Sequence, residues 1–323
     1  MDVMKTLNAV VLHNVDCEKG EGIDLANEFK VRGYPTWVLV DSNREPIARW
    51  SGYEKDFFIE TMAEVMADLS PIHVKADRFE KEPTLADALA VAKYNANASE
   101  YKSAVEYYTK TQELDKDNDY SYDIFENTAR GVRGELFTYD DAVRAGEIVF
   151  VASNAENKIL TASTMSTLAR RAERPDEMAK YLERGIDVEV AEDDEHALRN
   201  QKRLKIDYNL HVTGDSLKAI ELKKTTYDEG WTESPSRLNS FAWWCFENLV
   251  NLEEAETLSR KAVELSEPGS DRAQILDTVA QICKARGKLD EAIEVMKQAV
   301  ADDPNNKSYS ETLAEFESEL AEG

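Results

Sequence analysis

The sequence predicts a mostly α-helical fold, in which an incomplete α/β segment precedes a solenoid of about six helical hairpins. Near the C-terminus the runs LEEAETLSRKAVEL and LDEAIEVMKQAVAD superimpose, so Ala255 matches Ala292, 37 residues later. A repeat of this length indicates stacked units that cannot bury their apolar faces alone. The first 70 residues instead mix strand and helix periods. The break at Ser70-Pro71-Ile72 therefore separates a domain at 1–70 from a helical domain at 71–323.

Residues 1–70 change their apolar period along the chain. Runs of β-prone apolar residues predict strands, and segments with one apolar face predict helices. The predicted strands are Ala9–Leu12, Thr36–Val40 and Pro46–Trp50, and the predicted helices are Gly22–Phe29 and Lys55–Leu69. The polar residues between the last two strands predict a hairpin turn at Ser42-Asn43-Arg44.

Four short motifs in this segment resemble the C-terminal part of the thioredoxin-like family. They are Asn14-Val15-Asp16, Leu25-Ala26, the run VRGYPT that ends at Thr36, and Gly52-Tyr53. The resemblance implies that the Tyr34-Pro35 bond is cis and that the peptide group before the proline pairs with the extended backbone of a substrate. It therefore implies a substrate-binding groove. The residues that would line this groove are Gly33, Tyr34, Pro35 and Thr36.

The chain departs from this family in two ways. It contains no Cys-x-x-Cys, the motif whose thiolate carries the family's redox chemistry. The first two strands of the fold are also missing, and one of them would lie between the strands expected at residues 9–15 and 36–41. A sheet without its central strand leaves two rows of backbone donors and acceptors unpaired. Either Met1 is not the true start of the protein, or the remaining strands pair directly in a reduced sheet.

A small or apolar residue opens the second helix of each predicted hairpin. These residues are Ala104, Ala142, Met178, Ala219, Ala255 and Ala292, in steps of 36 to 41 residues. We expect the alanines to be buried where paired helices approach closely. The longest step contains the acidic run Glu189–Glu195, which predicts a longer connection. Residues Lys307–Glu322 predict an amphipathic helix that caps the solenoid.

The last hairpin resembles a tetratricopeptide repeat. The residues that carry the resemblance are Leu276, Ala280, Gly287, Leu289, Ala292, Ala299 and Pro304. The family's aromatic positions hold Cys283 and Met296 here, and Trp243 of the preceding copy stands where a small residue is usual. The resemblance implies a scaffold of paired helices that binds protein partners or extended peptides.

Candidate catalytic and metal-binding residues are few. Cys17, Cys245 and Cys283 form neither a Cys-x-x-Cys pair nor a disulfide framework. Cys17 lies in an acidic loop that does not favour a nucleophilic thiolate, and the other two are expected to be inert core residues on apolar helices. His13 and His73 lack partners at ligand spacing, so no metal site is predicted. No cofactor-binding motif is predicted either.

The chain carries 64 acidic and 39 basic residues, which give a formal charge of −25. This charge repels phosphate backbones and anionic membranes, so nucleic-acid binding is disfavoured. The apolar stretches are too short to span a bilayer, and the N-terminus lacks the pattern of a secretory signal. The chain as given is therefore expected in the cytoplasm; a leader upstream of Met1 would instead place it in an extracytoplasmic or periplasmic compartment. No pattern indicates an oligomeric state.

Two functions of different classes remain. The first is a non-catalytic module, in which a thioredoxin-like remnant and a helical scaffold bind a protein or an extended peptide. The second is a thiol-disulfide oxidoreductase whose Cys-x-x-Cys lies upstream of Met1. For the first, the repeat register makes four residues candidates for partner contact on the concave face, with ordinary packing between repeats as the other interpretation. These residues are Asn127, Tyr208, Trp244 and Gln281.

Overall fold

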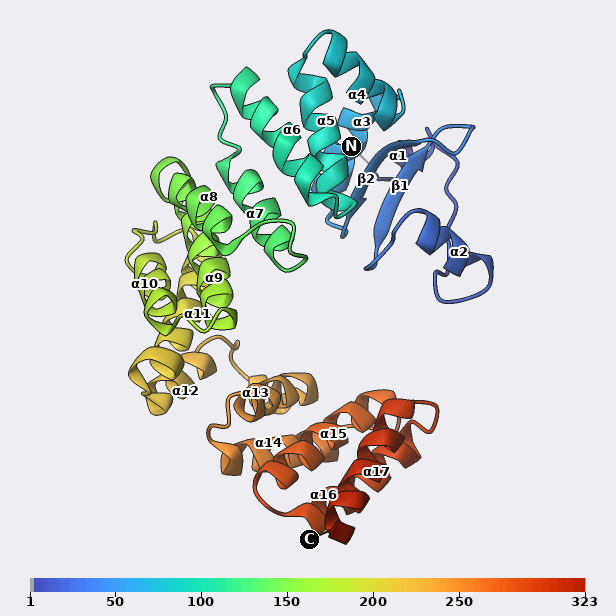
Figure 1. Cartoon of the computed structure of the whole chain (residues 1–323). Coiled ribbons are helices and arrows are strands. Elements are labelled where there is room, and N and C mark those ends of the chain that lie inside the picture. The colour runs from blue at the N-terminus through green and yellow to red at the C-terminus, as the bar shows by residue number, and fades with distance from the viewer. Residues whose placement is uncertain (1–2, 323) are drawn as a thin grey trace. The chain divides into compact units, whose positions relative to one another are not determined.

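The structure, a computed structural model, describes residues 3–322 and is mostly helical, as predicted. It divides into two compact units, Met1–Glu189 and Val190–Gly323, which are described in turn. Figure 1 shows the helices and the small sheet. The domain boundary expected after residue 70 falls inside the first unit and stays a prediction.

The first unit opens with short helices and one hairpin of strands. In chain order the elements are α1 (Val3–Leu7), α2 (Glu21–Glu28), β1 (Thr36–Val40), β2 (Pro46–Ser51) and α3 (Lys55–Met66). The two strands pair antiparallel, with Trp37 opposite Trp50 and Leu39 opposite Ala48. The Asp41 carboxylate caps the turn, since it accepts hydrogen bonds from the backbone N–H groups of Asn43 and Glu45. The predicted hairpin, its turn and both predicted helices are confirmed.

The strand predicted at Ala9–Leu12 is wrong. The chain there leaves a turn after α1 and continues without regular structure to residue 16, and Val11 is 98% exposed. An extended segment becomes a strand only when a neighbour satisfies its backbone groups. Within residues 3–322, β1 pairs with β2 alone. The sheet is therefore a two-stranded hairpin that the segment after α1 does not join.

An aromatic cluster holds this hairpin against α3. Trp37 and Trp50 stack at 6.3 Å between ring centroids, and Phe58 of α3 lies 4.8 Å from Trp37. Trp50, Phe58 and Met62 are buried. Arg49, which points to the opposite side of β2, donates hydrogen bonds to the carbonyls of Phe29 and Lys30. The end of α2 is thereby fixed to β2.

Helical hairpins make up the rest of the first unit. The helices are α4 (Ile72–Lys81), α5 (Leu85–Asn97), α6 (Tyr101–Leu114), α7 (Ser121–Val132), α8 (Tyr139–Ala152), α9 (Ala155–Arg171) and α10 (Pro175–Ile186). Helices α5 and α6, α7 and α8, and α9 and α10 pack as hairpins. A capping box between Thr138 and Asp141 starts α8. Lys93 of α5 bonds Glu64 of α3 at 2.8 Å, which links the hairpins to the N-terminal segment.

The second unit repeats the same construction. Its elements are α11 (Glu195–Tyr208), η1 (Asn209–Thr213), α12 (Ser216–Lys224), η2 (Trp231–Glu233), α13 (Pro235–Glu247), α14 (Leu252–Glu264), α15 (Ser270–Ala285), α16 (Leu289–Asp302) and α17 (Lys307–Glu322). Helix α16 packs against both α15 and α17, and Phe316 of α17 is buried in their shared core. Gly287, at φ +75°, allows the tight reversal between α15 and α16. The predicted capping helix is confirmed.

The alanines that mark the repeat are buried. Ala104, Ala142, Ala219, Ala255 and Ala292 are each 0% exposed, which confirms their predicted burial. The longer connection predicted near Glu189–Glu195 is also present, because residues 187–194 carry no helix. The division between the two units falls in this connection. The described chain therefore contains the predicted six hairpins, three in each unit.

Candidate binding groove

A groove of about 1280 Å³ lies in the first unit on the side of β1 away from β2. Residues 10–18, helix α2 and strand β1 line it, and Trp50, Phe58 and Met62 form its apolar floor. In Figure 1, α2 and the loop before it lie beside β1, opposite the side occupied by β2. The groove is open because residues 11–15 do not pair with β1 as a strand, which leaves the space next to β1 unfilled.

The structure places the predicted groove residues together. Tyr34, Pro35 and Thr36 line the groove, and the neighbouring Gly33 is exposed. The Tyr34–Pro35 bond is cis. The Thr36 hydroxyl donates to the Gly33 carbonyl at 2.7 Å, and the Pro35 carbonyl accepts from the Gly52 N–H at 2.8 Å. These bonds fix the segment at the end of the hairpin, while the Tyr34 side chain remains 65% exposed. Substrate contact by these residues stays a prediction.

The rim of the groove is acidic. Its carboxylates are Asp16, Glu18, Glu21, Asp24 and Glu28, whereas Arg44 is its one arginine among the described residues. Arg44 is paired with Glu28 at 2.5 Å and Lys19 with Asp16 at 3.2 Å, which leaves Glu18, Glu21 and Asp24 as the excess negative charge of the rim. The pKa of Tyr34 is raised by desolvation and by the nearby Cys17, Glu18 and Asp16. A cationic partner therefore suits this rim better than an anionic one.

Exposed apolar side chains border the same groove. Val11 and Leu12 line it, and both are exposed. Ile23 of α2, Tyr53 after β2 and Phe57 of α3 are also exposed in this segment. Exposed apolar residues gathered in one segment of a protein typically mark an interaction surface. The groove is therefore the strongest candidate for a binding site in the first unit.

The three cysteines are free. Cys17 is half-buried in the loop before α2, and its Sγ lies 3.9 Å from the Val15 carbonyl oxygen. Cys245 of α13 and Cys283 of α15 are buried, which confirms their predicted core positions. Burial and the nearby Glu254 raise the pKa of Cys245 to about 12, and burial raises the pKa of Cys283. Neither buried thiol is a nucleophile near neutral pH.

The 323-residue chain is expected to leave the reduction of insulin by dithiothreitol at its uncatalysed rate. Thiol-disulfide exchange needs an attacking thiolate and normally a second thiol to resolve the mixed disulfide, and Cys17 has no second cysteine close to it in the sequence. Turbidity of reduced insulin measures the rate, with Cys17→Ser as the control. Clear activity of the chain that Cys17→Ser abolishes would make Cys17 a single-thiol nucleophile and contradict this expectation.

The four predicted partner-contact residues have different surroundings. Asn127 of α7 is only 3% exposed, and its amide donates to the Asp123 carbonyl at 2.8 Å. Tyr208, Trp244 and Gln281 belong to the second unit and are half-buried. The Gln281 amide lies 3.4 Å from an Asp277 carboxylate oxygen, within its own helix. Partner contact by these residues stays a prediction, and the burial of Asn127 does not favour it.

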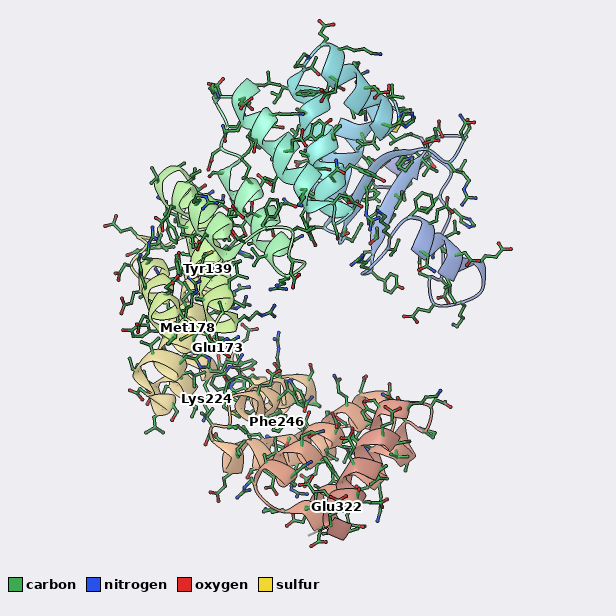
Figure 2. The ribbon with its side chains drawn as sticks, viewed as in Figure 1. Tyr139, Glu173, Met178, Lys224, Phe246 and Glu322 are labelled. Carbon is green, nitrogen blue, oxygen red and sulfur yellow. The ribbon has the colours of Figure 1, made fainter. Side chains whose placement is uncertain are left out.

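Sequence reasoning missed a cluster of lysines and aromatic rings between α12 and α13. Lys223 lies 5.5 Å from the ring centroids of both Tyr227 and Trp244, and burial lowers its pKa. Lys224, labelled in Figure 2, bonds Glu254 at 2.6 Å and lies 5.5 Å from the Phe241 ring. The adjacent lysines of α12 are a signal in the sequence, but only the fold places the rings of α13 beside them. The cluster joins the two helices.

An ion-pair network centred on Glu256 joins α14 to the next hairpin. The buried Glu256 carboxylate accepts from Arg260 at 2.9 Å, from Lys288 at 3.1 Å and from Arg286. Glu256, Cys283 and Glu291 have the spacing of metal ligands. The Arg260 guanidinium donates to all three of these residues, so a cation already occupies the position where a metal would bind. The group is therefore a structural network.

Among residues 3–322, none of the helices combines the length and the apolar composition that a bilayer span requires.

No family model and no curated protein matches the chain. Among solved structures it is similar to YrrB, a TPR protein with an unusual peptide-binding site, at 15% identity and a TM-score of 0.32, covering 74% of this chain and 96% of that one. It is also similar to the TPR2AB-domain:pHSP90 complex of yeast Sti1, at 15% identity and a TM-score of 0.28, covering 72% of this chain and 96% of that one. At TM-scores below 0.5 neither structure supports an inference about function, and the fold of this chain is shown by its own hairpins.

Proposed function

We propose that this chain is a non-catalytic binding module that takes a segment of a protein partner in the groove beside Tyr34 and Pro35. The observation that supports it best is the groove itself, which is large, has an apolar floor and is bordered by the exposed side chains of Val11 and Leu12. A volume of about 1280 Å³ is ample for several residues of a peptide. The exposed apolar surface is the part of this segment that binding would remove from water.

The helical hairpins serve in this proposal as a rigid support. We also propose that residues 1–70 are a thioredoxin-like domain and that residues 71–323 are a tetratricopeptide-like domain. Tyr208, Trp244 and Gln281 are proposed as a second contact surface on the helical part. Thiol-disulfide exchange, the alternative implied by the resemblance, needs a Cys-x-x-Cys that this sequence does not contain. It would have to lie upstream of Met1, which is outside the described residues.

Peptide selection on the whole chain tests the proposed function. A phage library of random dodecapeptides is panned on the immobilised protein, and the affinities of enriched peptides are measured by fluorescence anisotropy. Val11→Asp should weaken their binding by about tenfold or more, because a peptide would then cover an unpaired carboxylate. The side chain of Val11 is 98% exposed, so the substitution removes no core contact.

The chain offers a matched control at Val151. This residue of α8 is 84% exposed and lies outside the groove, so Val151→Asp makes the same change on a different surface. The control should leave peptide affinity unchanged. The proposed function is contradicted if no peptide is enriched, or if the enriched peptides bind Val11→Asp and Val151→Asp with the affinity of the unmodified chain.

A further inference from the structure

The strand β1 has one free edge, and the register identifies which residues face it. The Gly52 N–H donates to the carbonyl of Pro35, which has no N–H of its own, so the register directs the backbone groups of residues 35, 37 and 39 toward β2. In an antiparallel pair the residues between them direct their backbone groups the other way. The N–H and C=O groups of Thr36 and Val38 therefore point to the edge that β2 leaves open. This edge borders the groove.

A second row of backbone groups without backbone partners lies along the groove, at residues 11–15. The Val10 N–H donates to the Leu7 carbonyl, and the next backbone bond along the chain is the one that the Asp16 carbonyl accepts from Lys19. Within residues 3–322, the five residues in between make no backbone–backbone hydrogen bond. All five line the groove. Residues 11–14 are exposed, so water solvates their backbone groups, and a strand that enters the groove would replace this water with backbone pairing, as at the exposed edge of a sheet.

The lining restricts the chemistry of such a strand. The side chains at the floor are apolar, and those of Trp50, Phe58 and Met62 are buried beneath it. The rim carries carboxylates, with Asp16 and Glu18 at one border and Asp24 and Glu28 on α2. A strand that fits has β-branched apolar residues in its centre and lysine or arginine at its ends.

We propose that a protein partner inserts one extended segment of this chemistry between β1 and residues 11–15 and pairs its backbone with both. The proposal rests on the proposed function and specifies how the groove holds its partner. Successive residues of a strand point their backbone groups to opposite edges. Every second residue of the inserted segment therefore pairs with Thr36 and Val38, and the residues between them pair with residues 11–15. Backbone pairing supplies the affinity, and the floor and the rim select the side chains.

Backbone methylation of a peptide tests this pairing. The probe is a fluorescein-labelled nonapeptide with the centre Val-Thr-Val-Thr-Val between paired lysines, titrated into the whole chain and followed by anisotropy. N-methylation of the valines removes the donors of one edge, and N-methylation of the threonines removes those of the other. We expect each modification alone to weaken binding by about tenfold or more, since each removes backbone bonds. Replacement of the four lysines by glutamate should weaken binding as well, through the acidic rim.

The outcomes separate this proposal from the proposed function. If only one set of methyl groups weakens binding, the segment pairs with one edge, and insertion between two edges is overturned. If neither set does, side chains alone hold the peptide, and the strand proposal fails while the binding function stands. The strand proposal also fails, and the binding function stands, if the nonapeptide does not bind but the selected dodecapeptides bind and Val11→Asp weakens them. If the selection enriches no peptide, the proposed function itself fails.

Discussion

Replacing Glu256 by glutamine is expected to lower the free energy of unfolding by about 2 to 4 kcal/mol. The buried carboxylate accepts hydrogen bonds from Arg260, Arg286 and Lys288, and it links α14 to the hairpin of α15 and α16. Glutamine removes this anion from all three cations, although Arg260 and Lys288 keep the exposed Glu291 as an ion-pair partner. Because the cations are partly exposed, water reduces the cost below that of a fully buried pair. Urea unfolding followed by tryptophan fluorescence measures the change.

Glu291 provides the matched control for this network. It also bonds Arg260, at 3.0 Å, but its side chain is 53% exposed. Glu291→Gln should therefore cost less than about 1 kcal/mol, as exposed ion pairs do. Equal losses for Glu256→Gln and Glu291→Gln would mean that burial of the carboxylate has no special role.

The effect of Glu256→Gln should depend on pH. The pKa of Glu256 is lowered to about 2. Burial alone would raise this pKa, but the hydrogen bonds from Lys288, Arg260 and Arg286 lower it by more than burial raises it. A carboxyl group with a lowered pKa stabilises the folded state above its unfolded pKa, and this contribution is lost as the pH falls through its folded pKa. The stability difference between the two proteins should be constant from neutral pH to about 4.5 and should shrink between about 4.5 and 2.

Replacing Ala292 by leucine is expected to cost about 1 to 3 kcal/mol in the free energy of unfolding. Ala292 is 0% exposed in the core that α15, α16 and α17 share with Met296 and Phe316. The three added carbons have no space there, so α16 would have to move away from α15. Ala301, on the exposed side of α16, is the control, and Ala301→Leu should change stability little. Urea unfolding of both variants checks the expectation, and an unchanged midpoint for Ala292→Leu would show that the helix register is wrong.

The hairpins could be predicted because their signals are local. Spacing along a helix fixes which residues face the partner helix, so Ala255 and Ala292 identified the contact positions without knowledge of the fold. The pairing of β1 with β2 could be predicted from the sequence for a similar reason, since a short polar turn joins two β-prone runs. The capping helix followed from the spacing of Leu313 and Phe316.

The errors and omissions concern features that depend on distant neighbours. The run Ala9–Leu12 has the composition of a strand, but no described segment pairs with it as a strand, and the N–H groups of Ala9 and Val10 bond back to Thr6 and Leu7 in a turn. Register made Asn127 a candidate for partner contact, with packing between repeats as the other interpretation; α7 packs on both α6 and α8 and buries Asn127, and partner contact stays a prediction. The groove beside Tyr34 was implied by the resemblance. Its two rows of free backbone groups have no signature in side-chain patterns and could be found only in the structure.

Amide hydrogen exchange with and without a selected peptide tests directly whether the groove beside β1 is the binding site. We expect saturating peptide to slow exchange at residues 11–15 and at Thr36 and Val38, because these backbone groups border the groove and have no backbone partner. Exchange in helices α7 and α8 should stay the same. Slowing that is confined to residues 190–323, or binding that protects no amide of the first 40 residues, would contradict the assignment of the groove as the binding site.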